Sequence, residues 1–120
     1  MERIKELLKA ISDVLEASGA HSEVSHADFI RRTLAGPDEA LRAYLVSHAL
    51  WGGSGSIADS ALIDHPRLHR TLRYLLIALA REQRKLGLVN ERMDSWVFGF
   101  DGLVYWLYPR SWLHALKQIF

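Results

Sequence analysis

The sequence predicts a mainly helical single domain over residues 1–120, with about five helices and a small C-terminal β-hairpin. Apolar residues recur every three or four positions in several segments, and glycine or proline separates these segments. Hydrophobic residues make up 49% of the chain and charged residues 24%, which is the balance of a folded protein rather than a disordered one. A chain of 120 residues is long enough to bury one hydrophobic core.

Residues 2–18 form the clearest predicted helix, because one face is apolar and the other is charged. Gly19 follows and is expected to end this helix. The apolar face consists of Ile4, Leu7, Leu8, Ile11, Val14 and Leu15.

A linker over 19–24 is predicted to precede a second helix, which Ser25 caps and Gly36 ends. Pro37 suits the first turn of a third helix, where its missing N–H costs nothing, and this helix is expected to continue to Trp51. The residues expected to face inward are Ala27, Ile30 and Leu34 in the second helix, and Leu41, Tyr44, Leu45 and His48 in the third.

The segment from Trp51 to Asp59 interrupts the helical pattern with three glycines in four residues. Glycine is costly inside a helix and valuable where the backbone needs positive φ, which we expect at Gly53 or Gly55. Ser56 and Asp59 have the spacing of a capping box and predict a short helix or helical turn over 56–63. We call this segment the glycine corner; its marked residues are Trp51, Gly52, Gly53, Gly55, Ser56 and Asp59.

Residues 66–86 predict the longest helix, with Pro66 in its first turn and Gly87 as its stop. Its apolar face consists of Leu68, Leu72, Leu75, Leu76 and Leu79. The same helix is basic, because only Glu82 accompanies its cations: Arg67, Arg70, Arg73, Arg81, Arg84 and Lys85.

Aromatic residues crowd the C-terminal third of the chain. Asp101-Gly102 is a hairpin signal between two apolar runs, although the second run also suits a helix or an irregular aromatic flap. Ser111 is expected to cap a last helix over 112–120. We expect Trp51 and part of this cluster to close the core, and a partner to bind at Trp96, Trp106, Tyr108 and Trp112.

Composition narrows the classes of function. The net charge of +1 implies no general attraction to nucleic acid, and the lack of cysteine excludes disulfides, thiolate metal sites and cysteine catalysis. The charged N-terminus is unlike a signal peptide, and no apolar run is long enough to cross a bilayer. We therefore expect a cytoplasmic protein that does not bind membranes.

Two sequence motifs suggest ligand or metal binding, but neither has the surrounding residues or elements that such a site requires. Gly53–Ala58 formally satisfies the dinucleotide-binding fingerprint, but no β-α-β unit surrounds it. Anion binding by free amides of the glycine corner stays open as an alternative to a purely structural corner. His65 and His69, with Asp64, are spaced like metal ligands but without an identifiable third ligand. We expect no enzyme, no cofactor and no metal.

The glycine corner resembles a segment of small, mostly helical bacterial proteins of unknown function. These proteins carry Gly-Gly-x-Gly-Ser-x-x-Asp at mid-chain, which corresponds here to Gly52, Gly53, Gly55, Ser56 and Asp59. Proteins of this kind look like immunity proteins, which bind and neutralise a partner toxin. The resemblance therefore implies a bacterial, cytoplasmic protein without catalytic residues.

Two functions remain as expectations. The first is a protein-binding module of the immunity type, whose partner is a cognate toxin and whose aromatic patch could also pair two copies of the chain. The second is a small-ligand or nucleic-acid-binding protein that uses the glycine corner and the arginine-rich helix.

Overall fold

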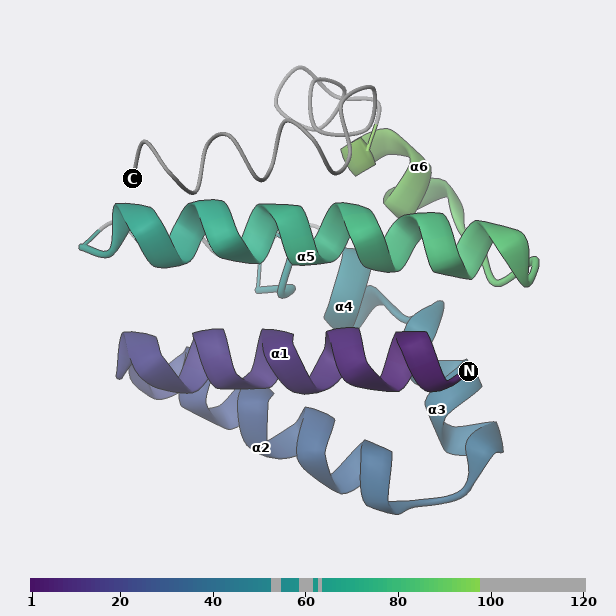
Figure 1. The fold of residues 1–120 in the computed structure, drawn as a ribbon, viewed down its shortest axis with the longest axis horizontal. Helices are drawn as coiled ribbons and strands as arrows, with labels where there is room; N and C mark the ends of the chain where they lie inside the picture. Colours follow the sequence, from purple (N-terminus) through teal and green to yellow (C-terminus); the bar gives the residue numbers. More distant parts are fainter. Residues whose placement is uncertain (53–54, 59–61, 63, 98–120) are drawn as a thin grey trace.

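A computed structural model describes residues 1–52, 55–58, 62 and 64–97. The described residues form six helices and no strand, which confirms the mainly helical fold (Figure 1). The helices are α1 (Glu2–Ser18), α2 (His21–Ala35), α3 (Asp38–Leu45), α4 (His48–Trp51), α5 (Pro66–Lys85) and α6 (Glu91–Val97). The predicted helix over 112–120, and the predicted hairpin beyond residue 97, lie outside the described residues.

Helix α1 is the centre of the fold, because α2 covers one side of it and α5 the other (Figure 1). Its predicted apolar face is buried, with Val14 only partly buried at the edge. One hydrophobic core joins residues from all six helices. Burial of an apolar side chain contributes about 1.5–3 kcal/mol, so the α1 face is a major source of stability.

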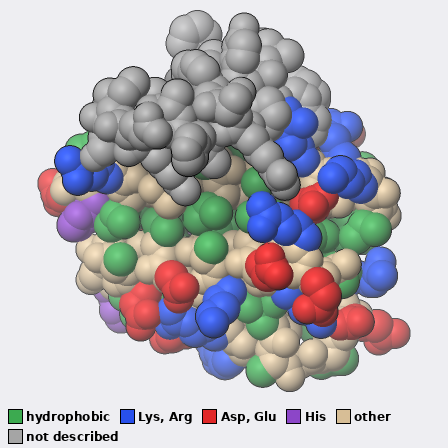
Figure 2. All heavy atoms as spheres, in the orientation of Figure 1, with side chains coloured by type: hydrophobic (Ala, Val, Ile, Leu, Met, Phe, Trp, Pro, Cys, Tyr) green, Lys and Arg blue, Asp and Glu red, His purple; other side chains and the backbone are tan. Residues whose placement is uncertain are grey.

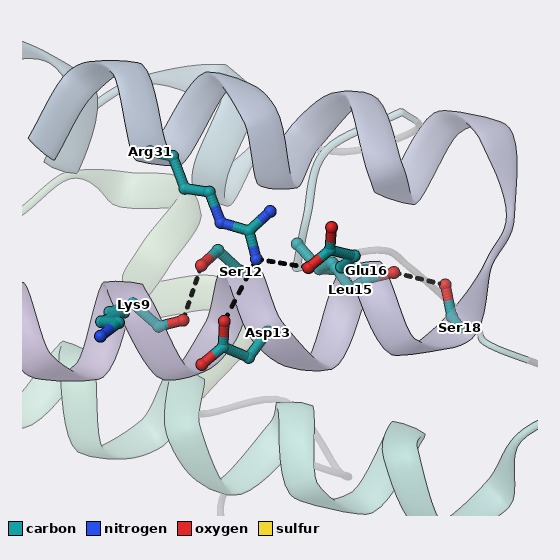
Figure 3. Close-up of polar contacts among 7 residues, drawn as sticks. All are labelled: Lys9, Ser12, Asp13, Leu15, Glu16, Ser18 and Arg31. Carbon is teal, nitrogen blue, oxygen red and sulfur yellow. Dashed lines mark hydrogen bonds and ion pairs between the residues drawn. The ribbon is translucent and has the colours of Figure 1, made fainter. Parts of the chain in front are cut away.

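Polar side chains complete the contact between α1 and α2. Arg31 of α2 reaches two carboxylates of α1, with Nη2 at 3.1 Å from Asp13 Oδ1 and 2.7 Å from Glu16 Oε2 (Figure 3). The Arg31 guanidinium holds the pKa of Glu16 below its ordinary value. The buried hydroxyls of Ser12 and Ser18 donate to Lys9 O and Leu15 O, each at 2.6 Å, so neither is an unpaired polar group.

The predicted linker over 19–24 is wrong, because α2 begins at His21 rather than after Ser25. Gly19 ends α1 with a φ of 72°, and this left-handed residue redirects the chain within one position. Only Gly19 and Ala20 separate the two helices, and the amide of Val24 donates to Ala20 O at 2.9 Å. The helix starts without a side-chain cap, so Ser25, the predicted capping residue, indicated a start that is too late.

The predicted continuous helix from Pro37 to Trp51 is also wrong, because it breaks at Val46 and Ser47. Ser47 is extended, with φ −84° and ψ 159°, and its hydroxyl donates to Tyr44 O at 2.6 Å. Because of this break, the residues of α4 do not continue the buried face of α3 at helical spacing. His48, predicted to be buried, is therefore exposed, whereas Trp51 is buried.

Helix α5 matches its prediction, and Gly87 follows its end with a φ of 74°. The sequence did not predict α6. Trp96 and Val97, which begin the apolar run expected to form the first strand of the hairpin, are helical instead. Among the described helices, none has the length and apolar character that a membrane crossing requires.

Candidate functional site

The glycine corner and the aromatic cluster meet at Trp51 and Trp96. Trp51 ends α4 and is 2% exposed, whereas Trp96 on α6 is partly buried. Their ring centroids lie 5.7 Å apart with the planes inclined by 54°, within the range of favourable aromatic pairs. The buried indole thus supports a second indole that still reaches the surface.

Gln83 fixes Trp51 from the core side. Its side chain is fully buried at 0% exposure, and Oε1 accepts a hydrogen bond from Trp51 Nε1 at 3.3 Å. The Nε2 group donates to Leu45 O and to Leu88 O, both at 2.8 Å. One amide therefore ties the end of α3, the end of α4 and the turn after α5 together.

Asn90 makes a second tie between the same regions. Its Nδ2 group donates to Val46 O at 2.7 Å, and its Oδ1 accepts from the amide of Met93 at 2.7 Å. The second bond is that of an N-cap residue at the start of α6. Asn90 thereby fixes the helix that carries Trp96 to the break between α3 and α4.

The glycine corner turns the chain back onto the end of α4. The amides of Ile57 and Ala58 donate to Ala49 O and Leu50 O, each at 3.0 Å, which satisfies carbonyls that a helix end leaves unpaired. Residues 55–58 lie in turns and bends. Of the two predicted forms, a short helix or a helical turn, the helix is therefore wrong over residues 56–58. The expected capping partner, Asp59, lies outside the described residues.

Two described glycines of the corner are needed for different reasons. A Cβ atom on Gly52 would lie 2.6 Å from His48 O, closer than van der Waals contact allows. Gly55 has a φ of 89°, which confirms the expected positive φ at one of the two named glycines and is strained for other residues. Gly53 lies outside the described residues.

The described part of the corner has few amides left for an anion. Ile57 and Ala58 donate within the fold, and the Gly55 carbonyl pairs with His26 Nε2 at 3.1 Å. This contact fastens the corner to α2. These contacts favour the structural interpretation of the corner over the anion-binding one.

The cations of α5 are partly neutralised. Arg84 pairs with Asp94 of α6, and Lys85 Nζ lies 2.9 Å from Glu82 Oε2. Acidic and basic side chains are interspersed over the α1–α2 half of the face in Figure 2. An extended single-sign surface, which nucleic-acid binding favours, is not visible on that half.

The predicted histidine pair lies at the start of α5. His65 is the residue before the helix, and His69 Nε2 accepts a hydrogen bond from Arg73 Nε at 3.0 Å. A ring nitrogen occupied by a guanidinium is poorly placed to hold a cation. Within the described residues, no three His, Cys, Asp or Glu side chains converge in a way that would hold a metal.

The remaining predicted partner residues, Trp106, Tyr108 and Trp112, lie outside the described residues. Sequence reasoning missed Gln83 and Asn90, although an asparagine followed by Glu91 carries the signal of a helix start. It also missed the contact of His26 with the corner, for which no local pattern exists.

Comparisons with known proteins identify no relative of this chain. No protein-family model matches the chain, and neither a curated protein nor a solved structure does.

Proposed function

We propose that this chain is a cytoplasmic protein-binding module of the immunity type, which neutralises a bacterial toxin by occluding its active site. The observation that carries the proposal is the seating of Trp96 on Trp51, 5.7 Å between ring centroids. A tryptophan that is already held in place loses little conformational entropy on binding. Tryptophan is also among the residues that dominate protein interfaces.

The surroundings of Trp96 support the same proposal. Glu91, Arg92 and Ser95 are exposed on the same short helix. Interfaces commonly place an apolar or aromatic anchor inside a polar rim, and α6 offers both. The proposal also assigns Trp106, Tyr108 and Trp112 to partner binding, with a toxin or a second copy of the chain as the partner.

The alternative of a small-ligand or nucleic-acid-binding protein has less support. It needs free amides at the glycine corner and unpaired cations on α5. Ile57 and Ala58 donate their amides within the fold, and Arg84 and Lys85 have carboxylate partners.

The test is coexpression of the full chain with a candidate toxin encoded beside it, with growth of the bacterial host as the readout. We expect the wild-type chain to restore growth and to form a stable complex with the toxin. Trp96→Ala is expected to weaken that complex by about 2 kcal/mol or more. Val89→Ala, at an exposed apolar residue of the preceding turn, is the matched control and should bind normally.

Two results would reject the proposal. One is a chain that neither binds nor neutralises any neighbouring toxin. The other is a Trp96→Ala variant that folds normally and binds as tightly as the wild type.

A further inference from the structure

Phe29 of α2 is a large aromatic residue that the fold holds at the surface. It is 49% exposed, and one side of its ring rests on Tyr44 of α3, which is only 5% exposed. The ring centroids lie 5.3 Å apart with the planes inclined by 40°. Phe29 is thus fixed from below while about half of its surface faces solvent.

Arg32 lies over the same ring and has no carboxylate partner in the described part of the chain. Its guanidinium carbon is 5.9 Å from the Phe29 centroid, within the range of a cation–π contact. Among the described residues, Arg32 makes no ion pair, even with Asp28 one turn earlier. Its neighbour Arg31, in contrast, holds both Asp13 and Glu16.

We propose that Phe29 and Arg32 form a second protein-binding surface, for a partner segment that places a carboxylate beside a large apolar side chain. The apolar side chain would cover the free part of the Phe29 ring. The carboxylate would accept the N–H donors of the Arg32 guanidinium, whose planar fork matches a carboxylate with two parallel hydrogen bonds. Stacking on Phe29 orients the fork before binding.

This surface is separate from the one proposed at Trp96. Helices α2 and α6 lie on opposite sides of the pair formed by α1 and α5 (Figure 1). The inference does not rest on the immunity function, and either proposal can fail without the other.

A protein partner fits the charges better than a nucleic acid does. Nucleic acids contact several cations along the phosphate backbone. Here Arg32 has no ion pair with another described residue, the adjacent Arg31 is already engaged by two carboxylates, and Asp28 is exposed beside Phe29. One free guanidinium matches one carboxylate.

The test selects binders to the immobilised full-length chain from a display library of random short peptides. We expect the selected peptides to carry Asp or Glu beside a large apolar residue. Their affinity should fall at least about tenfold for Phe29→Ala and for Arg32→Ala, and equally when the acid of the peptide becomes its amide. Arg32→Lys keeps the charge but not the fork, so it should restore only part of the affinity.

Arg31→Ala is the matched control, because it removes the neighbouring arginine but not the proposed contact, and it should leave peptide affinity unchanged. Amide shift changes in the wild-type chain, measured by NMR during peptide titration, should centre on α2 and the end of α3. This measurement does not depend on the folding of any variant.

Several results would overturn the proposal. They are selected peptides without acidic residues, unchanged affinity for both alanine variants, and loss of affinity only in Trp96→Ala. Binding of a single-stranded oligonucleotide through Arg32, or pairing of two copies of the chain through Phe29, would assign the surface to a different partner.

Discussion

The indole nitrogen of Trp51 donates to the side-chain oxygen of Gln83 across 3.3 Å inside the core. The two residues are 32 positions apart, so the bond joins the end of α4 to α5. Because Trp96 packs on Trp51, the position of the proposed binding residue depends on an amide that never reaches the surface.

Gln83→Leu is expected to lower the free energy of unfolding by about 3 kcal/mol, because it removes the side-chain partner of the Trp51 N–H, of the buried Leu45 carbonyl and of the partly buried Leu88 carbonyl. Trp96 should also lose its fixed position. Chemical denaturation measures the first effect, and the indole N–H signals in NMR spectra report the second. A loss below about 1 kcal/mol would show that water replaces the amide.

Asn90→Ala is expected to cost about 1–2 kcal/mol, because α6 loses its cap and Val46 O loses its donor. Asn90→Asp should cost less, since a carboxylate still accepts the amide of Met93 but cannot donate to Val46. Ser95→Ala, at an exposed position of the same helix, is the control and should leave the denaturation midpoint unchanged. Equal losses for both Asn90 variants would mean that only the Val46 contact matters.

The sequence predicted the long helices because their apolar faces follow the helical period over many turns. The face of α1, from Ile4 to Leu15, needs no tertiary information. The helix stops could also be predicted locally, because Gly19 directly follows α1, Gly87 lies two residues beyond the end of α5, and both glycines have positive φ. These parts of the fold could be predicted from neighbouring residues alone.

The break between α3 and α4 could not be predicted in this way. Neither Val46 nor Ser47 is a strong helix breaker, yet Gln83 and Asn90 bind the carbonyls of Leu45 and Val46 from 38 and 44 positions away. Such distant side chains replace the hydrogen bonds that a continuing helix would make. The candidate site shows the same limit. The choice of Trp96 as a partner-binding residue, made from the crowding of aromatics, stays a prediction, and the sequence did not predict that Trp96 lies on a helix.

Gly52→Ala and Gly55→Ala are expected to destabilise the fold for different reasons. At Gly52 the new Cβ meets His48 O at 2.6 Å, so any side chain should cost about 1–3 kcal/mol. At Gly55 there is space, and the φ of 89° makes alanine cost about 1–2 kcal/mol. Asparagine tolerates positive φ, so Gly55→Asn should recover part of the loss while Gly52→Asn should not.

Gly36→Ala is the control for both glycines, because its φ is negative and a Cβ there would make ordinary contacts of 3.5 Å or more. We expect thermal denaturation to shift little for this variant. We distinguish Gly52, where a side chain has no space, from Gly55, where the backbone has positive φ. If asparagine recovers stability at neither position, or equally at both, this distinction is wrong.

Tyr44 provides a test of pH dependence. Its hydroxyl is buried without a hydrogen-bond partner in the described part of the chain, and burial raises the pKa of Tyr44 above its ordinary value. At neutral pH, Tyr44→Phe should therefore be neutral or slightly stabilising, since it removes an unsatisfied hydroxyl. Above about pH 10, the unfolded chain releases the phenol proton while the folded chain keeps it. Wild-type stability should consequently fall as the pH rises through this range.

The Tyr44→Phe variant lacks this loss, so its advantage over the wild type should widen as the pH increases. Urea denaturation of both proteins at several values between about pH 8 and about pH 11 measures the difference. All other titrating groups are shared, so the difference between the two proteins isolates Tyr44. Stability curves that stay parallel across the range would mean that the Tyr44 hydroxyl ionises as easily in the folded protein as in the unfolded chain.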